Sequence, residues 1–161
     1  MRCCFIFIIL LLFRKVNRKM QNFVKLFSEK SRLYYKKTFS LPEGFVKERV
    51  ILHFGAVDQI STVYINGQEV GSNEGGYLPF SFDITDKLKD GDNIITVCAT
   101  DDLRSQNQPS GKQSQKYNSF GCFYTRTTGI WQTVWMEEVP FSYIKRIKAT
   151  PDIDRKLLRI E

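Results

Sequence analysis

The segment that most restricts the possible folds is residues 63–70, VYINGQEV. Apolar and polar residues alternate on both sides of a central Asn66-Gly67 pair. An Asn-Gly pair between alternating runs predicts a two-residue type I′ turn, in which both turn residues take positive φ. We therefore expect a β-hairpin at this position.

Other short segments with β-strand character follow at regular spacing, with turn residues between them. They cover residues 34–41, 49–54, 78–84, 94–99 and 131–135. Residues 94–99 are almost continuously apolar, as in a buried central strand. Residues 34–41 mix aromatic residues and threonine with lysines, which is typical of an edge or half-exposed strand. This pattern predicts an all-β protein with an antiparallel β-sandwich.

Both tryptophans lie in residues 123–135, FYTRTTGIWQTVW. The first half of this segment is a polar, threonine-rich loop. The second half alternates, with Trp131 and Trp135 on the same side, as in a strand. We expect the two indole rings to be large anchors in the core. A sharper hypothesis is that the loop lines a site with Arg126 at its rim.

The segment that contains the tryptophans also resembles a known family. Residues 123–137, FYTRTTGIWQTVWME, are similar to the end of the N-terminal sugar-binding domain of glycoside hydrolase family 2, the β-galactosidase and β-glucuronidase family. Earlier segments resemble the same domain in the same order: YYKKTFSLPEGF, RVILHFGAVD, VYINGQEVG, EGGYLPFSFDIT and DGDNIITV. The resemblance covers about residues 34–150. It implies a jelly roll of the galactose-binding type.

The resemblance and the composition together divide the chain into three parts. Residues 1–33 are an apolar and basic leader, residues 34–142 the sugar-binding sandwich, and residues 143–161 the start of a truncated immunoglobulin-like domain. The apolar run 5–13 suits a signal-peptide core and is shorter than the ~20 residues that a membrane-spanning helix needs. The spacing of the apolar residues within residues 21–33 is compatible with a short amphipathic helix.

The net charge of +7 comes from the leader and not from the domain. Residues 1–40 carry ten Lys or Arg and one Glu, which gives a net charge of +9. Residues 41–161 carry fourteen Lys or Arg and sixteen Asp or Glu, which gives a net charge of −2. We therefore expect no nucleic-acid partner. A membrane could be contacted only through residues 1–20. The chain would be exported or membrane-anchored if this leader is genuine, and cytoplasmic if it is not.

Catalytic machinery is not evident in the sequence. Retaining glycoside hydrolysis needs two carboxyl groups about 5–5.5 Å apart. The resemblance implies that both belong to a downstream (β/α)₈ barrel, which takes ~250 residues. We find no convincing carboxylate pair, and we expect no catalytic residue and no activity of this chain alone. His53 is the single histidine, and the four cysteines lack metal-ligand spacing, so no metal and no other cofactor is expected.

Three residues are candidates for substrate binding: Asp101, Asp102 and Arg126. Carboxylates and guanidinium groups can each hydrogen-bond two hydroxyls of a sugar. The resemblance implies that an aspartate after the strand at 94–99 reaches the sugar, a place held by Asp101 or Asp102, and that Arg126 matches an arginine recurring before Gly-Ile. The alternatives are loop capping for the aspartates and a structural ion pair or packed stem for the arginine. The long polar segment 101–118 is of a kind that is often functional.

Our leading hypothesis is a non-catalytic carbohydrate-recognition and scaffold domain of a family 2 glycoside hydrolase. It would form one wall of the pocket and contact the barrel of the full enzyme, which would hydrolyse O-glycosyl bonds of β-galactosides or β-glucuronides. The alternative is a stand-alone carbohydrate-binding module, tethered to a membrane by residues 1–20. A third hypothesis is a structural domain whose 101–118 loop meets a partner protein.

Overall fold

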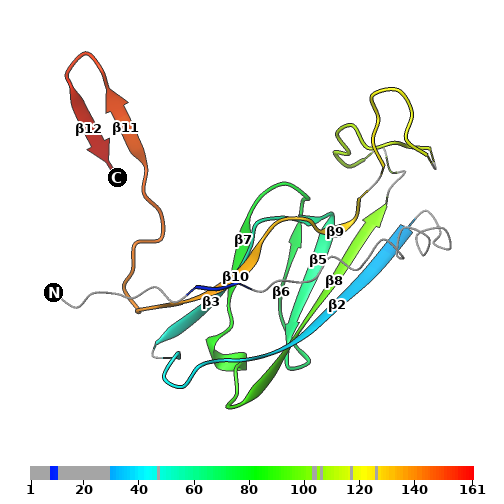
Figure 1. Cartoon of the computed structure of the whole chain (residues 1–161). Coiled ribbons are helices and arrows are strands. Elements are labelled where there is room, and N and C mark those ends of the chain that lie inside the picture. The colour runs from blue at the N-terminus through cyan, green and yellow to red at the C-terminus, as the bar shows by residue number, and fades with distance from the viewer. Residues whose placement is uncertain are drawn as a thin grey trace.

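The chain folds into two antiparallel sheets that pack face to face (Figure 1). The computed structural model describes residues 8–10, 30–46, 48–102, 105, 107–116, 118–125 and 127–161. One sheet has the order β1 (Ile8–Leu10), β10 (Val134–Val139), β3 (Arg49–Phe54), β7 (Phe80–Asp83). The other has the order β2 (Lys30–Ser40), β8 (Asp92–Asp102), β5 (Ile60–Ile65), β6 (Gln68–Glu74). The predicted antiparallel β-sandwich is confirmed.

Two short strand pairs complete the structure. β4 (Val57–Asp58) pairs with β9 (Gly129–Ile130) at one end of the sandwich. β11 (Ala149–Asp152) pairs with β12 (Leu157–Ile160) in a C-terminal hairpin that stands apart from the sandwich in Figure 1. A 3₁₀ turn at Thr85–Lys87 leads from β7 toward β8.

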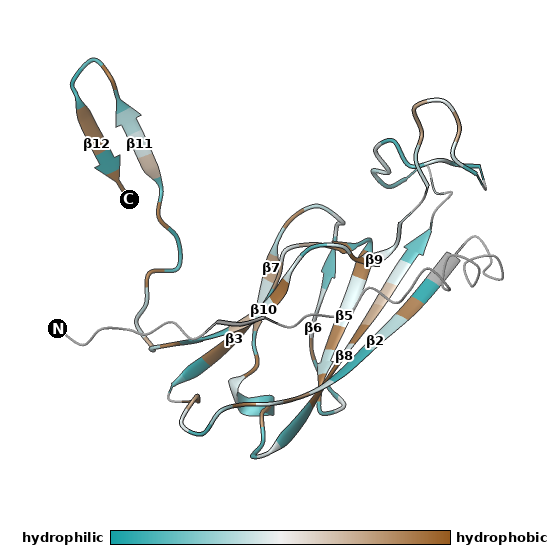
Figure 2. Cartoon of the chain, in the orientation of Figure 1, coloured by the Kyte–Doolittle hydropathy of each residue, from teal (hydrophilic) through white to brown (hydrophobic). Residues whose placement is uncertain are grey.

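The core lies between the two sheets, where alternate residues of each strand face inward. β8 shows this period of two along its whole length, from the buried Asn93 to the buried Asp101. Alternation arises because successive side chains of a strand point to opposite faces. Figure 2 shows the resulting brown bands along β3, β5 and β8. The largest fully buried side chains are Phe54, Leu52, Ile65, Ile84, Ile95 and Met136.

The Asn-Gly hairpin is confirmed in detail. Asn66 and Gly67 have φ values of 52° and 83°, and Ile65 pairs with Gln68 across the turn. The Asn66 side chain also fixes the neighbouring connections. Its Nδ2 donates to the Lys87 carbonyl and to Asn93 Oδ1, both at 2.8 Å, and its Oδ1 accepts from the Ile94 amide at 2.9 Å.

The tryptophan segment differs from the continuous core strand that its alternation suggests. β9 ends at Ile130, and β10 begins only at Val134. Between them the chain leaves β4 and moves alongside β3, where the Thr133 carbonyl accepts a hydrogen bond from the Gly55 amide at 2.8 Å. Neither indole is a core anchor, because Trp131 is 44% exposed and Trp135 lies on the outer face of its sheet.

On that outer face Trp135 stacks against His53, the single histidine. The ring centroids are 4.8 Å apart, and the planes are 9° from parallel. His53 Nε2 lies 2.7 Å from Glu137 Oε1, although the ring N–H does not point along that line as a hydrogen bond requires. His53 is thus half-buried on the outer face of the sheet, against the Trp135 ring.

The N-terminal part of the chain also departs from expectation. Residues 30–33 belong to strand β2, so the suggested amphipathic helix does not extend through them. Most of the leader, including residues 1–7 and 11–29, lies outside the described residues. Residues Ile8–Leu10 pair with β10 as an edge strand, opposite Glu137, Met136 and Trp135. Among the described residues, no helix has the length and apolar character needed to cross a membrane.

Candidate functional site

The side-chain chemistry concentrates at one end of the sandwich, where β8 stops and the loops between β8 and β9 begin. We call this region the loop end and define it as the described residues of 74–79 and 105–131, together with Asp58, Gln59 and Asp101. Asp101 is the last inward-facing residue of β8 and is only 2% exposed. Asp58 lies on β4, in the same end of the sandwich, and is 4% exposed.

Asp101 holds two parts of the long connection between β8 and β9 to the sheet. Its Oδ1 accepts a hydrogen bond from Gln108 Nε2 at 2.6 Å, and its Oδ2 accepts from Thr128 Oγ1 at 2.7 Å. Gln108 and Thr128 belong to the same connection between β8 and β9, Gln108 near its beginning and Thr128 at its end. Hydrogen bonds to a charged acceptor are stronger than those between neutral groups. Asp101 therefore fixes where the beginning and the end of this connection lie relative to each other.

Asp58 makes a parallel connection through Gln113. Gln113 Nε2 donates to Asp58 Oδ2 at 3.3 Å, and Gln113 Oε1 accepts from the Thr127 amide at 2.8 Å. The other oxygen, Asp58 Oδ1, has no hydrogen-bond partner among the described residues and approaches the Cα of Gly76. Gly76 allows this approach because a β-carbon there would collide with the carboxylate.

The Asp58 carboxyl group is electrostatically strained. Burial raises its pKa above the ordinary value of 3.8, and the nearby negative charge of Asp101 raises it further. The hydrogen bond from Gln113 lowers the pKa and opposes both effects only in part. A group with this pKa shift takes up a proton more readily than an exposed aspartate does. The loop end thus contains two neighbouring carboxylates. That of Asp58 has a raised pKa, and that of Asp101 has both oxygens hydrogen-bonded.

Exposed aromatic rings surround this buried network. Tyr77 and Trp131 make an edge-to-face contact with ring centroids 6.1 Å apart. Trp131 Nε1 donates to the Gly76 carbonyl at 2.8 Å, and the Tyr77 hydroxyl donates to the Pro109 carbonyl at 3.4 Å. Burial raises the pKa of the Tyr77 hydroxyl, helped by Asp58 and Tyr124. We call Tyr77, Tyr124 and Trp131 the aromatic rim.

The aromatic rim combines two features that saccharide sites require. Its rings offer flat apolar faces, on which the C–H groups of a sugar can pack. The Tyr77 hydroxyl and the Trp131 indole N–H are held by backbone carbonyls, which restrains the orientation of these two rings. Aromatic side chains with an apolar body and a hydrogen-bonding tip are common in such recognition sites.

The three residues predicted from sequence have different positions. Asp101 is buried beneath the loops, with both oxygens bonded inside the protein. Asp102 is half-buried and faces the opposite side of β8, because neighbouring residues of a strand alternate. Arg126 lies outside the described residues, between Thr125 and Thr127 of the same loop. Of the two candidates that the structure describes, Asp101 therefore faces the core and Asp102 faces the outer side of the sheet.

Sequence reasoning missed Asp58, Gln113 and Tyr77. These three residues are far apart in the chain and meet only because β4 pairs with β9 and the loops fold back over that pair. Asp58 does end a strand-like segment, and Tyr77 follows a Gly-Gly pair, which are the signals that could have drawn attention to them.

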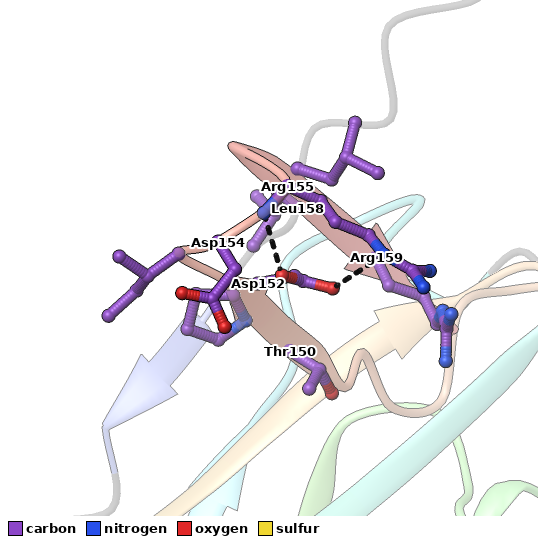
Figure 3. A pocket seen from close by; sticks show the side chains of 9 residues that line it. Thr150, Asp152, Asp154, Arg155, Leu158 and Arg159 are labelled. Carbon is purple, nitrogen blue, oxygen red and sulfur yellow. Dashed lines mark hydrogen bonds and ion pairs between the residues drawn. The ribbon is translucent and has the colours of Figure 1, made fainter.

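A further hollow lies outside the loop end. A hollow of about 820 Å³ lies along the C-terminal hairpin (Figure 3), and all of its lining belongs to residues 150–159. Asp152 there accepts a hydrogen bond from the Arg155 amide at 3.0 Å, so its charge is used within the hairpin. Within the described ranges, no group of three or more His, Cys, Asp or Glu residues could hold a metal ion.

Comparison with known proteins places these features in a family. The model of the glycosyl hydrolases family 2 sugar binding domain matches residues 20–140. A β-galactosidase of Thermoanaerobacter pseudethanolicus is 34% identical over 121 residues, which are 74% of this chain and 15% of that protein. A β-glucuronidase of Formosa agariphila is 44% identical over 71 residues, which are 44% of this chain and 7% of that protein.

Solved structures give the same result. The crystal structure of a Bacteroides uniformis β-glucuronidase superposes with a TM-score of 0.55 at 32% identity, covering 69% of this chain and 12% of that one. The chain therefore spans only about one seventh of the length of the β-galactosidase that it matches. On the strength of the family match, this chain belongs to glycosyl hydrolase family 2 and contains the sugar binding domain of that family.

Proposed function

We propose that this chain is a non-catalytic recognition domain whose loop end forms one wall of a glycosidase pocket. The observation that carries the proposal is the aromatic rim, which is exposed and yet held in place by a buried network. Exposed rings with fixed orientation are suited to packing against a pyranose ring. The catalytic groups would come from a (β/α)₈ barrel elsewhere in a larger polypeptide, and the substrates would be β-galactosides or β-glucuronides.

Within this proposal the sequence-predicted residues have separate roles. Asp101 acts through the loops that it bonds, as a positioning residue, because both of its oxygens are already used. Arg126 and Asp102 contact the sugar or the barrel in this proposal. Asp58 keeps one carboxylate oxygen unbonded among the described residues, so it offers an acceptor if the loops move apart.

The proposal also covers the two ends of the chain. Residues 143–161 are taken as the start of a further, immunoglobulin-like domain, and residues 1–33 as a leader. Exposed apolar side chains on the C-terminal hairpin support the first assignment, since such side chains are usually covered. They include Ile153, Leu157, Leu158 and Ile160.

The test is an activity and binding assay on the chain alone. We expect no release of nitrophenol from nitrophenyl β-galactoside or nitrophenyl β-glucuronide. Calorimetric titration with methyl β-galactoside should give little or no heat, because one wall of a shared pocket does not enclose the sugar. Turnover that survives purification and disappears when a residue of this chain is changed would overturn the proposal. Tight binding of the galactoside would instead support a stand-alone carbohydrate-binding module.

A further inference from the structure

A second candidate site lies on the solvent-facing side of the β2-β8-β5-β6 sheet. A hollow of about 480 Å³ opens there, a volume within the usual range of ligand pockets. We call it the outer hollow. The strand register places its residues in adjacent rows, with Arg32 beside Thr100 and Ile60, and Tyr34 beside Cys98 and Thr62. The residues that line it are Arg32, Tyr34, Ile60, Thr62, Tyr64, Cys98 and Thr100.

The polar groups of the outer hollow are free to bind a ligand. Within the described part of the chain, the Arg32 guanidinium makes no ion pair and no hydrogen bond. The hydroxyls of Tyr34, Tyr64, Thr62 and Thr100 likewise have no side-chain partner among the described residues. This differs from the loop end, where Asp101 has both oxygens bonded. A ligand in the outer hollow would therefore break no internal bond.

The charge of the lining selects the class of ligand. Arg32 is its single ionised side chain, and no carboxylate is among the lining residues. A guanidinium presents N–H donors in a planar fork that matches a carboxylate. Asp102 lies one row beyond Thr100 on the same face, and Glu74 lies beyond Ile60 on β6, so carboxylates bound the positive surface on the Arg32 side. On the other side Lys36 adds one exposed cation in the row of Tyr64. This geometry fits one or a few acidic units and not a long polyanion.

The remaining lining fits the body of a sugar. Tyr34 is 66% exposed although it lies on a sheet face, and Tyr64 is half-buried on β5. Their rings can pack against pyranose C–H groups, while the hydroxyls of Thr62 and Thr100 can both donate and accept. We propose that the outer hollow binds a carboxylate-bearing saccharide, with Arg32 on the carboxylate and the two tyrosine rings beside the pyranose.

This site is separate from the loop end. Thr100 points outward from β8, and Asp101, the next residue, points inward beneath the loops. The two sites are thus on different surfaces of the sandwich. The outer hollow consequently does not depend on the proposed role of the loop end.

The experiment is a titration of the whole chain with trigalacturonate, followed by calorimetry and by the backbone amide signals of Thr62 and Thr100 in nuclear magnetic resonance. Fully methyl-esterified trigalacturonate is the matched neutral ligand, because it has the same rings and linkages without the charges. We expect the free acid to bind at least five-fold more tightly than the ester. Arg32→Gln should abolish this preference, and Tyr34→Ala should weaken binding of both ligands.

Lys36→Gln is the matched control, because Lys36 is an exposed cation on the same face of β2 but does not line the outer hollow. It should leave both affinities unchanged. Equal binding of acid and ester, or equal losses in the Lys36 and Arg32 variants, would overturn the inference. So would signals that shift only at the loop end and are lost in Trp131→Ala, an outcome that would favour the proposed function instead. A dimer by sedimentation, with the hollow buried in it, would also contradict the inference.

Discussion

At the scale of single residues, the buried carboxylates of Asp58 and Asp101 hold the parts of the loop end together through hydrogen bonds. Asp101 replaces what regular structure would otherwise supply, because the described residues of the connection between β8 and β9 form no named strand of their own. The beginning and the end of this connection take their positions from side-chain bonds to one carboxylate. The aromatic rim depends on this connection, so its geometry depends on Asp101 as well.

Replacing Asp101 with alanine should therefore destabilise the fold. The change removes two hydrogen bonds to a charged acceptor and leaves their donors without it, which costs on the order of 2–4 kcal/mol. Urea unfolding followed by circular dichroism measures this loss. Asp90→Ala is the control, because the exposed Asp90 side chain makes no hydrogen bond within the described residues. A loss for Asp101→Ala no larger than that for the control would contradict the anchoring role.

Asp58 should give the fold a dependence on pH. Its pKa is raised in the folded protein above the ordinary value of 3.8, so the folded state holds the proton more tightly than the unfolded chain does. Protonated Asp58 therefore contributes to the free energy of unfolding below pH 3.8, and this contribution is lost as the pH rises through the raised pKa. Asp58→Asn removes this titration and should gain stability relative to wild type over that range. Parallel stability curves for the two proteins from acid to neutral pH would contradict the assignment.

At the scale of elements, the alternation of apolar residues was a good guide to the strands and a poor guide to the segment around the tryptophans. The hairpin at Asn66-Gly67 is set by local turn chemistry, and the central strand β8 by its apolar content, so both were predictable. The alternation around Trp131 and Trp135 looked like one strand. The chain there changes partners from β4 to β3, which is a property of the assembled sheets.

The same reasoning explains which parts of the candidate site could be predicted. The polar segment after an apolar strand pointed to the connection after β8, and the family resemblance pointed to Asp101 or Asp102 at its start. Asp58 and Gln113 meet across 55 positions of the chain, and no local pattern records that contact. The network beneath the aromatic rim therefore required the three-dimensional arrangement of β4, β9 and the loops.

The Asn66 turn allows local conformation to be separated from hydrogen bonding. Asn66→Gly keeps the positive φ at low cost but removes the three side-chain bonds to Lys87, Asn93 and Ile94. Each such bond contributes about 0.5–1.5 kcal/mol, so we expect a loss of roughly 2–3 kcal/mol. Asn66→Ala should lose more, because it adds strain at positive φ. Chemical denaturation of both variants measures the two contributions, and equal losses would show that conformation is unimportant here.

At the scale of the whole molecule, the sandwich and the C-terminal hairpin are expected to be independent. The contacts of β11 and β12 are mainly with each other, and residues 143–161 are almost entirely exposed. Removing residues 143–161 should therefore leave the unfolding free energy of the sandwich unchanged within about 0.5 kcal/mol. Thermal unfolding of the shortened chain measures this directly. A markedly lower Tm would mean that the hairpin supports the sandwich.

The most direct test of the central claim is the kinetics of a chimera. Residues 20–140 of this chain would replace the matching segment of the Thermoanaerobacter pseudethanolicus β-galactosidase, with nitrophenyl β-galactoside as substrate. Trp131→Ala in the chimera should raise KM about tenfold, the equivalent of about 1.4 kcal/mol of binding, without lowering its Tm. Tyr34→Ala, in the outer hollow, should change neither. An unchanged KM in the Trp131 variant of an active chimera would contradict the claim that the loop end faces the sugar.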